Sequence, residues 1–325
     1  MNKVINDIML VGIDEAGLGP LLGPLVVSAA AFTIPAGVNK ESMWLMLKDS
    51  VSNHKKNLAG RMLVCDSKKA YTPALGIAYL EKTVLACLKH LDKTPTSVAQ
   101  LVNALCPQCG DRLRQYPWHK NYDNRLIKFN ADDISICAGA FGKNLEKNKM
   151  SLSALKSFCF DTAYYNDMVQ KVNNKSTVVF TAVCGLVDEI IKSSYCRNFH
   201  FVIDRQGGRE NYVRPLRTMF GDMELKVLSQ DDLKSSYELS TQHKSVRIDF
   251  CVRADAEHLP VCLASMASKY LREQLMGCLN DYFISKCASL KPTAGYWTDG
   301  KRFLKDIKEI APHITYDSNQ LIRSR

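Results

Sequence analysis

The sequence lacks most of the patterns that would place it in a repetitive or extracellular class. Its 325 residues contain no internal repeat and no low-complexity tract, and the seven histidines have no metal-ligand spacing. The twelve cysteines are scattered from Cys65 to Cys287 without the spacing of a disulfide framework, and residues 1–7 lack the apolar core of a signal peptide. We therefore expect a cytoplasmic protein and, because no sustained heptad pattern is found, a monomer.

Negative charge and uninterrupted apolar segments are also scarce. The chain has 33 acidic and 43 basic residues, and its formal net charge of +10 favours a polyanionic partner such as nucleic acid without identifying one. Residues 16–38 carry no charge, but Pro20, Pro24 and Pro35 interrupt them, so we expect two buried strands there and no membrane span. A content of 46% hydrophobic residues is typical of a globular protein, and this length can bury a large core.

The most informative motif is Asp-Glu-Ala-Gly-Leu-Gly-Pro at residues 14–20. The preceding run, residues 8–13, is short, uncharged and rich in branched side chains, which is typical of a buried strand. Gly17 and Gly19 allow the tight turns and close backbone approach of ligand-binding loops. Adjacent buried acids repel each other unless a cation compensates them. Because another apolar strand follows at 25–32, we favour a divalent cation site over the alternative, an acidic surface turn.

Two further acids follow predicted strands. Residues 199–203 form an apolar run that ends at Asp204, and residues 246–252 alternate between apolar and polar side chains before Asp255. Together with Asp14 and Glu15, these residues would bring four carboxylates to one edge of an α/β sheet. Such oxygen ligands suit Mg²⁺ or Mn²⁺. The sequence therefore predicts a divalent cation site at that edge.

The remaining elements are expected to be mainly helical. Thr72 suits the N-cap and Pro73 the first position of a helix that runs to about His90, and apolar periodicity predicts helices at 177–193 and 260–279. The pattern weakens from about 103 to 161, which we interpret as an insertion. We expect a single catalytic domain spanning residues 1–325, with a helical C-terminal region at about 280–325.

The expected insertion leaves two alternatives open at each of two places. Cys106 and Cys109, with His119 and Cys137, are compatible with a structural zinc site, but the absence of a second Cys-x-x-Cys pair favours two reduced cysteines in a loop. The aromatic and basic residues at 116–120 are compatible with stacking on single-stranded bases. Packing of this segment against the core is the favoured alternative.

Five motifs in the same order resemble the ribonuclease HII (type 2 ribonuclease H) family. The segment 14–20 matches the family's Asp-Glu-Ala-Gly-Arg-Gly-Pro opening apart from Leu18, and 65–69 resembles its Asp-Ser-Lys-Lys element. The third and fourth acids, Asp204 and Asp255, match in position. The helix segment 264–272 and the Gly-Tyr element at 295–296 complete the set. The resemblance covers about two thirds of the chain.

This resemblance implies a ribonuclease H-like mixed sheet flanked by helices and an endoribonuclease that cleaves the RNA strand of RNA/DNA hybrids or DNA duplexes with embedded ribonucleotides. It implies two Mg²⁺ or Mn²⁺ ions held by Asp14, Glu15, Asp204 and Asp255. The backbone of Gly17, Leu18 and Gly19 would contact the ribose 2′-hydroxyl, and Tyr296 would stack on the adjoining sugar. The residues that would bind backbone phosphates are Ser67, Lys68 and Lys269.

One departure concerns Leu18, which replaces a family arginine near the scissile phosphate. Arg205 and Arg209, in a loop that differs from the family pattern, are candidates to replace the lost charge. Two alternatives therefore stay open, a nuclease of the same fold with a shifted substrate and a hybrid-binding protein with little turnover. Retention of all four acids favours an active enzyme.

Overall fold

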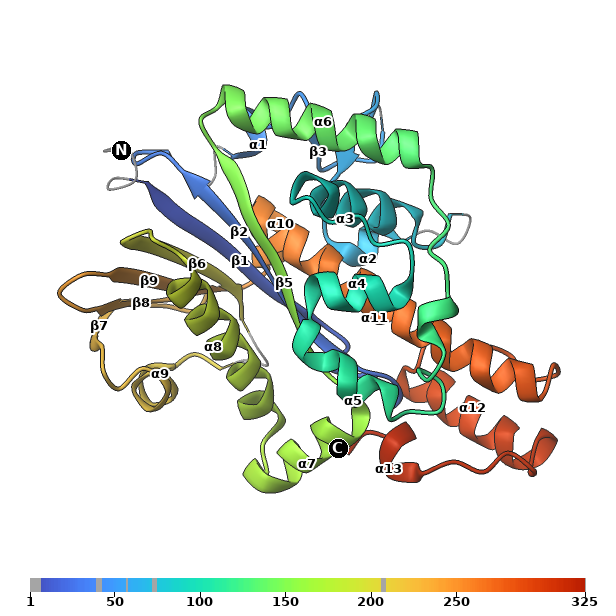
Figure 1. Ribbon diagram of the computed structural model, residues 1–325. Coiled ribbons are helices and arrows are strands. Elements are labelled where there is room, and N and C mark those ends of the chain that lie inside the picture. Colours follow the sequence, from blue (N-terminus) through green and yellow to red (C-terminus); the bar gives the residue numbers. More distant parts are fainter. Residues whose placement is uncertain (1–6, 39–42, 57, 72–74, 206–208, 325) are drawn as a thin grey trace.

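The protein, seen here as a computed structural model, is built on one large mixed sheet (Figure 1). The structure describes residues 7–38, 43–56, 58–71, 75–205 and 209–324. In this part of the chain the main sheet has seven strands in the order β5-β2-β1-β6-β9-β8-β7, and β3 and β4 form a separate pair. The strands are β1 (Ile8–Ala16), β2 (Leu25–Ile34), β3 (Val51–Ser52), β4 (Met62–Leu63), β5 (Ser151–Phe160), β6 (Asn198–Asp204), β7 (Glu224–Gln230), β8 (Lys234–Ser240) and β9 (Ser245–Cys251).

Three neighbouring strands of the sheet run parallel and end at the same edge. β1 pairs with β6 in the register Ile13 to Ile203, and β6 pairs with β9 in the register Asp204 to Cys251. The β1–β2 and β2–β5 pairs are antiparallel, as are β9–β8 and β8–β7. The predicted mixed sheet flanked by helices is therefore confirmed, and the predicted strands at 8–13, 25–32, 199–203 and 246–252 all form.

Helices cover both faces of the sheet, because successive strand residues point to opposite sides and both sets are apolar. Leu10 faces the layer that contains α3, α4, α6 and α11, whereas Met9 and Val11 face the layer that contains α7, α8 and α9. The longer described helices are α3 (Ala78–His90), α4 (Val98–Leu105), α6 (Ala131–Lys147), α7 (Thr162–Val172), α8 (Lys175–Ser193), α11 (Leu259–Lys286) and α12 (Trp297–Ile310). The short ones are α1 (Met43–Met46), α2 (Ser67–Ala70), α5 (Gly110–Arg114), α9 (Val213–Met219), α10 (Ala254–Glu257), α13 (Ser318–Leu321), η2 (Pro107–Cys109) and η3 (Tyr122–Asn124).

Helix α11 fixes the position of the strand that carries the first two acids. It lies directly across β1 and β2. A Cβ atom on Gly12 would stand 2.1 Å from the carbonyl carbon of Pro260, so a glycine is needed for this close approach. The predicted helix at 260–279 is confirmed and continues to Lys286, and the predicted helix at 177–193 is confirmed as α8. Thr72 and Pro73 lie outside the described residues, and the described helix of that region begins at Ala78.

The interpretation of residues 103–161 as an insertion outside the core is wrong. Ser151–Phe160 is strand β5, which pairs along β2 in the main sheet. The helices before it pack on the sheet, and Leu105, Leu113 and Phe141 are part of its buried core. The segment therefore supplies an edge strand and much of one helical layer.

The structure gives a separate answer for the cysteine motif and for the aromatic motif. Cys106 and Cys109 form a disulfide, so they are neither zinc ligands nor reduced thiols in this structure. Tyr116 and Trp118 are buried, and the Trp118 ring lies 6.0 Å from that of Phe283 on α11. The aromatic segment therefore packs against the core, as favoured. Among the described helices none is long and apolar enough to cross a membrane.

Candidate active site

The four predicted acids lie at the edge where β1, β6 and β9 end. Asp14 and Glu15 lie near the end of β1, and Asp204 is the last residue of β6. Asp255 lies in α10, which begins immediately after β9 through a left-handed residue, Arg253 (φ 56°). The Ala254 amide donates a hydrogen bond to Asp204 Oδ1 at 2.7 Å, which ties this turn to the end of β6.

The charges of these acids act on one another. Burial raises the pKa of Asp14 well above its usual value, and the charges of Glu15 and Asp204 raise it further. Burial and the charge of Asp204 raise the pKa of Glu15 to about 7, whereas burial and the charge of Asp255 raise that of Asp204 to about 6. The pKa of Asp255 is also raised, first by burial and then by Asp66. Like charges that shift each other in this way face a common region.

The donor chemistry of this region suits a hard divalent cation, although the side chains are not yet gathered around one point. In the described ranges, no three carboxylate, imidazole or thiol groups stand close enough to hold a single metal ion. The four acids supply only oxygen donors, and burial together with neighbouring carboxylates raises the pKa of each. A cation binding here would remove a repulsion that the structure already contains.

Helix α2 brings the predicted phosphate-binding residues beside the acids. Asp66 caps this helix by accepting a hydrogen bond from the Lys68 amide at 2.9 Å. The positive charge of Lys68 lowers the pKa of Glu15, Asp204 and Asp255, which places its ammonium group near all three. Ser67 is buried and accepts a hydrogen bond from Ser265 of α11 at 3.0 Å. This hydrogen bond holds the Ser67 hydroxyl against α11.

The loop after β1 requires glycine at its first position. Gly17 has a φ of +96°, and a Cβ atom there would meet the Pro24 carbonyl oxygen at 2.6 Å and Nε of Arg272 at 2.7 Å. Gly19 is exposed and has open space around its Cα. Leu18 is half-buried and packs on the apolar layer that contains α8. The loop conformation is therefore set at Gly17 and by its neighbours.

Tyr296 and Lys269 lie close to the same loop. The Tyr296 side chain is 48% exposed, with Nζ of Lys269 5.8 Å and Cζ of Arg272 5.4 Å from its ring centre. Lys269 also forms an ion pair of 2.6 Å with Glu273. An exposed aromatic ring beside two cations is compatible with contact to a nucleic-acid strand.

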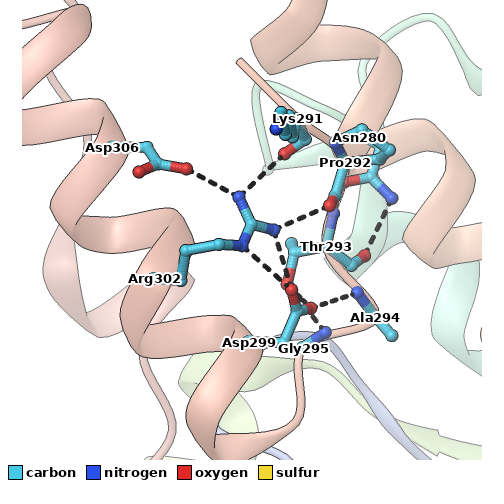
Figure 2. A network of polar contacts seen from close by, with 9 residues as sticks. All are labelled: Asn280, Lys291, Pro292, Thr293, Ala294, Gly295, Asp299, Arg302 and Asp306. Carbon is cyan, nitrogen blue, oxygen red and sulfur yellow. Dashed lines mark hydrogen bonds and ion pairs between the residues drawn. The ribbon is translucent and has the colours of Figure 1, made fainter.

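A polar network holds the segment that carries Tyr296 (Figure 2). Arg302 of α12 contacts Asp299, Asp306 and the carbonyl oxygen of Pro292. Asp299 accepts hydrogen bonds from the Thr293 hydroxyl and the Ala294 amide. The next residue is Gly295, whose carbonyl oxygen accepts the amides of Leu21 and Leu22 at 2.8 and 3.0 Å. The network thereby fixes the segment that binds Leu21 and Leu22, at the end of the loop that follows β1 (the glycine loop).

Arg205 and Arg209 are engaged elsewhere. The guanidinium of Arg205 donates to the carbonyl oxygens of Asp231 and Asp232, at 3.0 and 2.6 Å. Arg209 lies over the Phe180 ring and lines, with Arg214, a pocket of about 690 Å³ between α8 and α9. None of the four acids lines that pocket. The structure thus gives no support to the hypothesis that either arginine replaces the one absent at position 18.

Arg323 is a residue at this site that sequence reasoning missed. Its guanidinium donates hydrogen bonds to the carbonyl oxygens of Gly17 and Leu18. The sequence around it, Leu-Ile-Arg-Ser, contains no motif, and the contact spans almost the whole chain. Only the folded arrangement of the C-terminal region reveals it.

Comparisons with known proteins agree with the motif resemblance. No protein-family profile matches the sequence. A segment of 81 residues, 24% of this chain, is 37% identical to ribonuclease HII of Gluconobacter oxydans, and the match spans 38% of that protein's length. Among solved structures, RNase HII from an Archaeoglobus fulgidus PCNA complex aligns with 98% of this chain and 94% of its own at 14% identity and a TM-score of 0.44.

A second solved structure is Bst-RNase HIII in complex with Mn²⁺, which aligns with 98% of this chain and 67% of its own at 14% identity and a TM-score of 0.43. The inference rests on the sequence match, which is 37% identical over 81 residues. This match confirms the resemblance predicted from the motifs: this chain is similar to ribonuclease HII.

Proposed function

We propose that this protein is a metal-dependent endoribonuclease that cleaves the RNA strand of RNA/DNA hybrids or DNA duplexes with embedded ribonucleotides. The observation that carries the proposal is the position of Asp14, Glu15, Asp204 and Asp255 at the edge where β1, β6 and β9 end, with the pKa of each raised by burial and by neighbouring carboxylates. The similarity to ribonuclease HII and the net charge of +10 support it.

The four acids would hold two Mg²⁺ or Mn²⁺ ions. Bound there, the ions would activate a water molecule and stabilise the oxygen that leaves from phosphorus. Cation binding would be favoured there, because burial and neighbouring carboxylates raise the pKa of Asp14 and Glu15 and so disfavour their charged forms without a counter-charge. Lys68 adds one cation beside them. Ser67, Lys68 and Lys269 would bind phosphates on either side and position the duplex without reading its sequence.

Recognition of the ribose would come from the glycine loop and from Tyr296. The backbone of Gly17, Leu18 and Gly19 would contact the 2′-hydroxyl, which is the group that distinguishes RNA from DNA. Tyr296 is exposed enough to stack on the adjoining sugar. We further propose that the chain works as one catalytic domain, as a monomer and in the cytoplasm.

A cleavage assay tests the proposal. Two DNA duplexes of one sequence, with and without a single ribonucleotide, are incubated with the protein and Mn²⁺ or Mg²⁺. We expect cleavage of the ribonucleotide-containing strand alone, and its loss in Asp14→Asn and Asp204→Asn. Asp188→Asn, on the exposed side of α8, is the matched control and should retain activity.

Three results would contradict the proposal in different ways. Cleavage of both duplexes would favour the alternative of a nuclease with a shifted substrate, for which the leucine at position 18 is the motivating observation. Tight binding of the ribonucleotide-containing duplex without cleavage would favour a binding protein. Equal cleavage by the Asp14→Asn variant would show that the acids are not the reaction centre.

A further inference from the structure

The end of the described chain returns to the glycine loop. After α13, Ile322 forms an antiparallel bridge with Leu22, and the Arg323 amide donates to the Leu21 carbonyl oxygen at 2.9 Å. Asn166 of α7 holds the segment from the other side by donating to the Ile322 carbonyl oxygen and accepting the Ser324 amide, at 2.9 and 2.7 Å. Figure 1 shows the C-terminus beside α7 and α13. Residues 322–324 are therefore docked on both sides.

This docking buries Arg323 against the loop. The residue is 4% exposed, and its guanidinium carbon lies 4.2 Å from the centre of the Tyr165 ring. The guanidinium donates to the carbonyl oxygen of Gly17 and, at 3.1 Å, to that of Leu18. A fork of two donors matches two successive carbonyl oxygens, which a lysine could not grip in the same fixed geometry.

The hydrogen bonds from Arg323 to the Gly17 and Leu18 carbonyl groups fix the direction of the amides that follow them. In a planar trans peptide the C=O and the following N–H point in opposite directions. Because the Gly17 and Leu18 carbonyl groups face Arg323, the amides of Leu18 and Gly19 face away from it. Neither amide donates a hydrogen bond to another residue within the described ranges. Two adjacent amides on a glycine turn form a concave donor site of the kind that binds anions and hydroxyls.

Positive charge accumulates behind this donor site. Arg272 is fully buried under Gly17, and its partner Glu273 lies 3.4 Å from Nη1. Arg323 has no carboxylate partner among the residues that the structure describes, and its Nε is buried without a hydrogen-bond partner. The loop therefore has two guanidinium groups on its inner side, although its own middle residue, Leu18, is neutral.

We propose that Arg323 is a positioning residue for the substrate, which sets the amides of Leu18 and Gly19 toward the ribose by holding the carbonyl groups of Gly17 and Leu18. The proposal rests on the proposed function, because it names the part of that site that reads the ribose. It assigns the role to contacts made through the loop backbone and not to direct contact of Arg323 with the substrate.

The experiment compares Arg323→Gln and Arg323→Lys with Lys308→Gln, a control that removes an exposed charge from α12. Binding of duplexes with and without one ribonucleotide is measured for each full-length variant, and the amide signals of residues 17–19 are followed by NMR. We expect Arg323→Gln to shift those signals and to weaken binding of the ribonucleotide-containing duplex about tenfold, with less than about a twofold change for the all-DNA duplex. Arg323→Lys should restore only part of this difference.

The outcomes separate the two proposals. Equal weakening for both duplexes would overturn the positioning role in favour of simple charge, and unshifted loop amides would overturn it directly. If wild-type protein does not distinguish the duplexes, the proposed function fails, and the amide signals alone then decide the positioning role. If Arg323→Gln does not fold, the positioning role is tested with Arg323→Lys and with Arg323→Ala, whose binding should be rescued by millimolar guanidinium. Absence of rescue in a folded Arg323→Ala variant would count against the positioning role.

Discussion

At the scale of single residues, replacement of Leu18 tests whether the loop after β1 faces a phosphate of the proposed substrate. An arginine there would add a charge next to the loop that already has Arg272 and Arg323 behind it. We expect Leu18→Arg to leave the fold intact and to tighten binding of a ribonucleotide-containing duplex by about one to two decades. The dependence of binding on salt should become steeper, because one more phosphate is neutralised.

Binding measured at two salt concentrations checks this expectation. Leu18→Met is the matched control, because it changes the shape of the side chain without adding charge. Weaker binding of Leu18→Arg at both concentrations would show that the loop does not face a phosphate. It would also favour the nuclease with a shifted substrate.

The acids give a second prediction at this scale. Burial and neighbouring charges raise the pKa of Glu15 from 4.5 to about 7 and that of Asp204 from 3.8 to about 6. A raised pKa means that the folded state binds the proton more tightly than the unfolded chain does. The resulting stabilisation is complete below the unfolded pKa values and is lost as the pH rises through about 6 and 7.

Denaturant unfolding of metal-free protein at several pH values tests this sign. Buried His119, whose pKa is lowered to about 3 by burial, acts in the opposite direction, so the comparison must be with a variant. We expect the free energy of unfolding of wild type, relative to the Glu15→Gln/Asp204→Asn variant, to fall between pH 4.5 and 8. A difference that stays constant or rises would show that the acids do not share a region.

Sequence patterns predicted the strands that carry the candidate acids better than the contacts between side chains. The acids follow apolar strands, and a parallel sheet brings strand ends together, so their position at one sheet edge was predictable from local patterns. The role of Arg323 was not, because it depends on how α12 and α13 return the chain to β1. The engagement of Arg205 by the carbonyl oxygens of Asp231 and Asp232 is equally invisible in the sequence.

At the scale of elements, the contact between β1 and α11 has a sharp steric requirement. Gly12 lies against the backbone of Pro260 and Val261, and an added Cβ would stand 2.1 and 2.2 Å from their atoms. We expect Gly12→Ala to displace α11 from β1 and to lower the free energy of unfolding by about 1–3 kcal/mol. Because Asp14 follows two residues later on the same strand, activity should fall as well.

Chemical denaturation provides the measurement, with Gly185→Ala as the control. Gly185 lies in α8, where an added Cβ would meet nothing within 4 Å, so an alanine there should stabilise the helix by about 0.5–1 kcal/mol. Equal behaviour of the two variants would show that the approach of α11 to β1 is not as close as described.

The edge strand β5 shows why one element was missed. Its buried residues include Leu152 and Leu155, three positions apart, because a bulge shifts the pairing with β2 beside Ala31 and Phe32. The shift breaks the period of two that identifies a strand in a sequence. The inner strands β1, β2 and β6 carry continuous apolar runs and β9 keeps a period of two, so all four were easier to predict.

At the scale of the whole molecule, a divalent cation should stabilise the fold. Cations that bind the four acids in the folded state alone shift the unfolding equilibrium, by about 2.7 kcal/mol at a concentration one hundred times the dissociation constant. We expect Mn²⁺ to raise the thermal unfolding midpoint at pH 8 relative to EDTA. The shift should be lost in Asp14→Asn and kept in Asp188→Asn. An equal shift in both variants would place the bound cation elsewhere.

The contact between Arg323 and Gly17 joins groups 306 positions apart in the sequence. Contacts of such separation carry a large entropy cost of loop closure and form late in folding. The β1–β2 hairpin, whose partners are close in sequence, can present Asp14 and Glu15 much earlier. A chain between these stages would have Asp14 and Glu15 on a formed hairpin while the loop that follows β1 is not yet fixed by Arg323. Folding order itself would then delay activity until the last described residues have docked.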